Sequence, residues 1–235
     1  MNKRLSALTP VAAVQCRRAA RFFGWQWRGI LGLCVLGLAG CSLPIQAPQP
    51  QETWRLDAAK IVTKPVLVEG QPRTVSILLR NVSPAQGLES PAMMYSRAPQ
   101  VLAPYRDNRW LAPPADMIGD ALNQTLARQP WVAGVFRTGG TARVQIGLSC
   151  TLEKLEHDIQ GTEGAAHLAM DCVWLDPKTR AIQAHWRFDR SEALAQNNAE
   201  DFAAGAQRLL DQALVDIVQQ TRDLVPGLAQ GSADD

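Results

Sequence analysis

The sequence has few of the motifs that mark common enzymes. It contains no glycine-rich phosphate loop followed by Lys and Ser or Thr, and no Gly-x-Ser-x-Gly segment. Its three histidines, His157, His167 and His185, lack metal-site spacing, so each is expected to be a surface or partly buried strand residue. Acidic pairs such as Glu153 and Glu156 fit a solvated face. The sequence therefore predicts a protein that is not an enzyme and uses no cofactor or metal.

Positive charge is also scarce once the N-terminal segment is set aside. The chain has 24 Lys and Arg against 22 Asp and Glu, but six of the bases lie in residues 1–29, which contain no acid. The rest carries 18 bases against 22 acids, a net charge of −4, without a basic stripe, which argues against nucleic-acid binding. No later segment approaches eighteen consecutive apolar residues, so no spanning helix is expected there.

The N-terminal segment has the three-part pattern of a secretion signal. The basic residues are followed by an apolar run, residues 30–39, and then by Gly40 and Cys41. At about 1.5 Å per residue, this run spans only about half of a ~30 Å hydrocarbon layer, too short for a stable membrane helix. We therefore expect residues 1–40 to be a cleaved signal peptide.

The sequence Leu38-Ala39-Gly40-Cys41 resembles the lipobox of bacterial lipoproteins. In that class the cysteine thiol receives a diacylglyceryl group and the freed amine is usually acylated as well, so we expect Cys41 to be lipidated. Several acyl chains at about 0.8 kcal/mol per buried methylene make a strong anchor. Ser42, in place of Asp, resembles an outer-membrane address. The expected location is the periplasmic face of the outer membrane.

The remaining chain has the size of one domain. Residues 41–52 are rich in Pro and Gln and are expected to form a tether, residues 53–226 a folded domain, and residues 227–235 a disordered tail. Helices are predicted over 116–128 and from Asn198, capped with the help of Asp201, to Pro226. Strands are predicted over 53–67, 74–82, 93–96, 101–110, 142–158, 166–176 and 182–190.

This order of elements predicts an α+β fold. We expect a single domain with a mainly antiparallel sheet and two amphipathic helices packed on one face. Five tryptophans could line a lipid groove, or could fill the core between sheet and helices, which is the commoner arrangement: Trp54, Trp110, Trp131, Trp174 and Trp186.

Cys150 and Cys172 are candidates for a disulfide. A hairpin symmetric about Gly161 places them directly opposite each other, and the alternation puts both on the apolar face. Opposed Cβ atoms are near the range that a disulfide can close, and the periplasm is oxidising. Two buried reduced thiols are the alternative, because a slip of one residue would separate them.

The segments TVSILLRNVSPAQGLESPAMMYSR and VLAPYRDNRWLAPPADMIGDALNQTL resemble the ABC-type transport auxiliary lipoproteins over roughly residues 52–225. The resemblance rests on the lipobox and on seven positions in these segments, which are Leu88, Pro91, Tyr95, Tyr105, Arg109, Trp110 and Pro113.

The resemblance implies an accessory role in transport. Such lipoproteins accompany an MCE-domain protein that crosses the periplasm, sometimes with an ABC transporter, and the cargo is phospholipid or another hydrophobic molecule. The expected contacts with the MCE partner lie on the sheet face or in residues 83–113, with Tyr105, Arg109 and Trp110 as candidates. Alternatively, Trp110 packs under the helix and Arg109 points to water. A periplasmic lipid carrier and a cell-envelope assembly factor are the competing functions, and self-association is left open.

Overall fold

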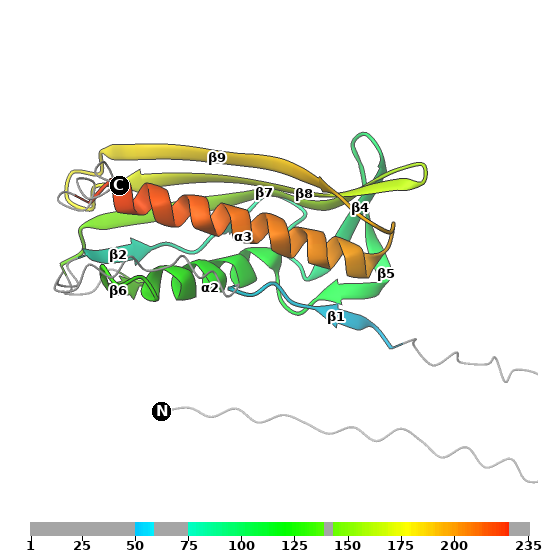
Figure 1. Cartoon of the computed structure of the whole chain (residues 1–235), viewed down its shortest axis with the longest axis horizontal. Coiled ribbons are helices and arrows are strands. Elements are labelled where there is room, and N and C mark those ends of the chain that lie inside the picture. Colours follow the sequence, from blue (N-terminus) through cyan, green and yellow to red (C-terminus); the bar gives the residue numbers. More distant parts are fainter. Residues whose placement is uncertain (1–49, 59–74, 139–142, 226–235) are drawn as a thin grey trace, which may run out of the picture. The chain divides into compact units, whose positions relative to one another are not determined.

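The computed structural model describes residues 50–58, 75–138 and 143–225, which belong to one compact unit (Figure 1). The predicted signal peptide, Cys41 and the predicted C-terminal tail lie outside the described residues. Within the described part of the chain, no helix is both long and apolar enough to cross a membrane.

The fold is α+β, as predicted, with one sheet covered on one face by two helices (Figure 1). The strands are β1 (Glu52–Trp54), β2 (Val75–Leu79), β3 (Ser83–Pro84), β4 (Ala92–Ala98), β5 (Val101–Trp110), β6 (Val132–Phe136), β7 (Ile146–Gln160), β8 (Glu163–Leu175) and β9 (Ile182–Ala193). The helices are α2 (Pro114–Ala127) and α3 (Ala199–Asp223).

The long pairings of the sheet are antiparallel and join neighbours in sequence: β4 with β5, β7 with β8, and β8 with β9. Shorter strands extend this frame in parallel. β1 pairs with β5, and β2, β3 and β4 all pair with β7. The sheet is thus mostly antiparallel by residue pairs, and its parallel pairings join strands that are not neighbours in sequence.

The first predicted strand, 53–67, is wrong in its extent. β1 ends at Trp54, and residues 55–58 are irregular, although Leu56 is buried. Residues 59–67 lie outside the described residues. At the other end, Gln51 and Glu52, which were assigned to the tether, already contact β5: Gln51 Nε2 donates to the Arg106 carbonyl at 3.0 Å, and Glu52 pairs with Asn108.

α3 begins after the predicted cap, Asn198, whereas α2 begins at Pro114, two residues before the predicted start. Pro114 occupies the first position of α2, where its missing N–H costs no helical hydrogen bond. Asn198 caps α3, and its side chain accepts a hydrogen bond from the Asp201 N–H at 2.8 Å. Asp201 differs from the expected box, because its carboxylate accepts from the Gln196 N–H rather than from the cap residue.

The core lies between the sheet and the two helices. Trp110, Trp174 and Trp131 are buried there, and Trp54 and Trp186 pack against its edge. The Trp174 indole donates to Thr221 Oγ1 at 2.9 Å, which ties β8 to α3. The tryptophans therefore fill or border the core, which is the commoner of the two arrangements considered, rather than line a lipid groove.

The hairpin of β7 and β8 has the predicted register at the cysteines but not at its turn. Cys150 pairs with Cys172, whereas at the turn Gln160 pairs with Glu163 across two residues. The first of these two, Gly161, has φ +63°, which suits a two-residue hairpin turn that begins with glycine. The two registers differ by one residue because β7 carries a bulge between Leu152 and Lys154.

This bulge exchanges the two faces of β7. Before it, even-numbered residues such as Leu152 point to the core, and after it odd-numbered residues such as Leu155 do. The structure joins Cys150 and Cys172, both buried, by a disulfide with Cα atoms 4.1 Å apart. That the bond forms in the mature protein is a prediction.

Removing the disulfide is expected to lower the free energy of unfolding. The bond closes a loop with a sequence separation of 22, for which the chain-entropy relation gives about 3 kcal/mol. The double variant Cys150→Ala/Cys172→Ala should show this loss in urea unfolding, and reduced wild-type protein serves as its matched control. If unfolded, unreduced wild-type protein takes up two alkyl groups at these positions, the bond is absent.

Candidate functional site

The three residues predicted to contact a partner do not form one surface. Trp110 has 0% exposure and packs edge-to-face on Phe202 of α3, with ring centroids 5.7 Å apart. This burial agrees with the alternative that Trp110 packs under the helix, because β5 turns this side chain into the core. Arg109, the preceding residue on the strand, is exposed, as is Leu111 at 56%. We call Arg109 and Leu111 together the Arg109 surface.

Tyr105 is partly buried and faces inward. Its hydroxyl lies 2.6 Å from His157 Nδ1 of β7, and burial raises its pKa above the ordinary value. The Tyr105 ring also meets Tyr95 of β4 edge-to-face, with centroids 5.1 Å apart. The Tyr105 hydroxyl is hydrogen-bonded and its ring is partly buried, so little of the side chain is available to bind a partner. Tyr105 instead packs β5 against β4 and β7.

His157 is fully buried, which corrects the expectation of a surface or partly buried strand residue. Its ring stacks on Phe202 at a centroid distance of 5.3 Å, and burial lowers its pKa. Its Nε2 has no hydrogen-bond partner among the described residues. The bulge accounts for the burial, because it turns Leu155 and His157 inward. The sequence signal for the bulge was the change from even-numbered apolar positions, up to Leu152, to odd-numbered ones, from Leu155.

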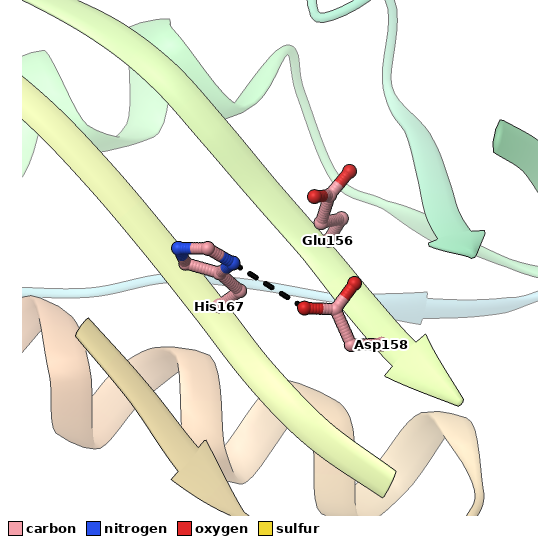
Figure 2. A group of neighbouring side chains, drawn as sticks. All are labelled: Glu156, Asp158 and His167. Carbon is pink, nitrogen blue, oxygen red and sulfur yellow. Dashed lines mark hydrogen bonds and ion pairs between the residues drawn. The ribbon is translucent and has the colours of Figure 1, made fainter. Parts of the chain in front are cut away.

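The same bulge turns a group of charged residues to the opposite face of the sheet. Figure 2 shows Glu156, Asp158 and His167 side by side, each with a possible ligand atom within 4.8 Å of the others. The His167 nitrogens lie 3.3 Å from Asp158 and 2.6 Å from Asp189, and Lys154 Nζ lies 3.1 Å from Glu156.

These contacts form an ion-pair network. Lys154 already supplies a cation to Glu156, and this contact raises the pKa of Lys154. The hydrogen bond from His167 lowers the pKa of Asp189. Since each carboxylate of the group has a donor among the described residues, we assign no metal to it. His185 makes a similar pair with Asp171 at 2.6 Å.

Two surface hollows lie at opposite ends of the sheet. One, of about 1020 Å³, is lined by residues such as Arg143, Asp176 and Lys178 near the turn between β8 and β9. The other, of about 630 Å³, lies beside the β4–β5 hairpin, and its lining includes Arg97 and Arg106. Neither contains an arrangement of nucleophile, base and oxyanion donor.

The described residues thus form an α+β domain with one sheet and two helices. The sequence-family model described as the ABC-type transport auxiliary lipoprotein component matches residues 57–218, and the chain belongs to this family. The family is one of transport accessory lipoproteins, so the indicated role is in transport rather than in catalysis.

Solved structures share this fold at low sequence identity. A Xanthomonas campestris protein of known crystal structure has 18% sequence identity to this chain and a TM-score of 0.59. The match covers 80% of this chain and 98% of that one. A second, uncharacterised protein is 10% identical with a TM-score of 0.58, and the match covers 74% and 99% of the two chains. These likenesses establish the fold alone. Comparison with curated protein sequences finds no significant match.

Proposed function

We propose that the protein is an outer-membrane lipoprotein that serves as the periplasmic docking component of an MCE-type intermembrane lipid transport system. The family match over residues 57–218 is the observation that carries the proposal, because it assigns the chain to lipoproteins that assist ABC-type transport. The lipobox at Cys41 and the serine that follows it support the outer-membrane location. The partner is an MCE-domain protein that reaches across the periplasm.

A lipid carrier is less well supported by the geometry. An acyl chain held between sheet and helices needs an open groove, and the large side chains Trp110, Trp174, Phe188 and Phe202 fill that space with almost no exposure. An adaptor needs only an accessible surface with suitable side chains. The Arg109 surface offers an arginine beside an exposed leucine, a combination that can desolvate an interface and still contribute charged hydrogen bonds.

Co-purification from the native envelope tests the function and the surface together. We expect the lipidated wild-type protein, solubilised in detergent, to recover an MCE-domain protein. Arg109→Glu should lower this recovery at least about tenfold, which is the loss of ~1.4 kcal/mol expected for an arginine near the centre of an interface. Arg128→Glu is the matched control, because Arg128 is also exposed but follows the far end of α2.

The outcomes separate the two parts of the proposal. Recovery by wild type and by both variants would retain the function and exclude the Arg109 surface. Recovery of phospholipid without any MCE-domain protein would contradict the adaptor role and favour a carrier. Urea unfolding of each variant shows whether a lost interaction comes from lost folding.

A further inference from the structure

The tip of the β4–β5 hairpin exposes apolar side chains. Val101 is 58% exposed and Leu102 is 49% exposed, at the start of β5. They follow a two-residue turn, since Ala98 pairs with Val101 across Pro99 and Gln100. Pro99 and a left-handed Gln100, with φ +67°, fit a type II turn. Adjacent large aliphatic side chains at a protruding turn contribute nothing to the core of this domain.

Cationic and aromatic side chains lie directly behind these apolar residues. Arg106 is 87% exposed in its side chain, and the Arg97 guanidinium lies 4.9 Å from the centre of the Tyr95 ring. Both arginines line the 630 Å³ hollow beside the hairpin, together with Tyr95 and Tyr105. A membrane interface changes from acyl chains to phosphates and then to water. Aliphatic residues at the tip suit the acyl chains, and the arginine and tyrosine residues behind them suit the phosphate layer.

The first described residues, 50–52, lie beside β5, the strand that begins at the hairpin tip (Figure 1). Gln51 is hydrogen-bonded to the Arg106 carbonyl, and Arg106 is five residues from Val101, about 17 Å along the strand. The ten residues from Cys41 to Pro50 can span up to ~35 Å. The tether is therefore long enough for the hairpin tip to reach the bilayer that holds an acylated Cys41.

We propose that the β4–β5 hairpin is a second membrane contact. Val101 and Leu102 enter the interfacial region of the bilayer, and Arg97 and Arg106 bind the phosphates of anionic phospholipids. The proposal rests on lipidation of Cys41, which is part of the proposed function. It also gives the domain an orientation, because the Arg109 surface lies seven residues beyond Leu102, up to about 24 Å along β5 and away from the membrane.

Lipid-borne quenchers test this contact in the full lipidated protein. A fluorophore is attached to Val101→Cys, and the protein is reconstituted in vesicles of phosphatidylethanolamine and phosphatidylglycerol that carry bromine on their acyl chains. The matched control is Ile182→Cys, since Ile182 is 67% exposed but begins β9 at the other end of the sheet. Cys150 and Cys172 are buried and do not compete for the label.

We expect the label at position 101 to lose most of its fluorescence and the label at position 182 to keep it. Adding Arg97→Glu and Arg106→Glu should restore the fluorescence at position 101 in these anionic vesicles. If the protein floats with the vesicles but the labels at positions 101 and 182 keep equal fluorescence, the hairpin contact alone would be overturned. Protein that fails to float with the vesicles would overturn the Cys41 anchor and this proposal with it. If the environment of the label at position 101 changes only after an MCE-domain protein is added, the hairpin contacts that protein rather than lipid, and the membrane-contact proposal would be overturned.

Discussion

Replacing Cys41 by serine is expected to abolish acylation and to remove the protein from the outer-membrane fraction. The serine hydroxyl cannot form the thioether that carries the diacylglyceryl group, and the described domain contains no spanning helix to replace the anchor. Two hairpin side chains offer far less apolar surface than several acyl chains at about 0.8 kcal/mol per methylene. The measurements are incorporation of labelled palmitate and membrane fractionation.

Cys34→Ser provides the matched control for this experiment. Cys34 lies inside the apolar run, seven residues before Cys41, so its loss leaves the Leu38-Ala39-Gly40-Cys41 sequence intact. This variant should be acylated and localised like the wild type. An intact mass of the mature wild-type protein without acyl groups would contradict the lipobox assignment, and so would palmitate incorporation by Cys41→Ser.

Trp110→Ala is expected to cost about 3–5 kcal/mol of the free energy of unfolding, the range for a large aromatic residue removed from a core. Trp110 is fully buried against Phe202 and lies where β5 leads into α2, so its loss leaves a cavity between sheet and helices. Urea unfolding measures the change. If the variant keeps wild-type stability but loses its partner, Trp110 is a contact residue after all.

Arg109→Ala is the control for that measurement. Arg109 precedes Trp110 on the strand but is exposed, and the side-chain hydrogen bond that it makes within the described residues is a long contact of 3.4 Å to the Trp110 carbonyl. Substitutions of this kind usually change stability by less than about 0.5 kcal/mol. A loss comparable to that of Trp110→Ala would mean that Arg109 is structural, and would remove the basis for the Arg109 surface.

Local patterns in the sequence were sufficient for most of the elements. The apolar stripes of α2 and α3, the Asn198 cap, and the turns around Pro99 and Gly161 all depend on interactions between residues close in the chain. The α+β class follows from the order of these elements. The predicted pairing of Cys150 with Cys172 is found, but it depends on the bulge after Leu152, which shifts the register by one residue from that of the two-residue turn.

The tertiary structure alone decided which side chains are available for function. Alternation along β5 places Arg109 and Trp110 on opposite sides, but only the position of α3 shows that Trp110 faces the core. In β7 the bulge after Leu152 reverses the faces, which turns His157 into the core and turns Glu156 and Asp158 to the opposite face. Such features depend on partners far away in the sequence. Composition and spacing therefore predicted a lipid-anchored protein and its fold class, whereas long-range packing determined its surfaces.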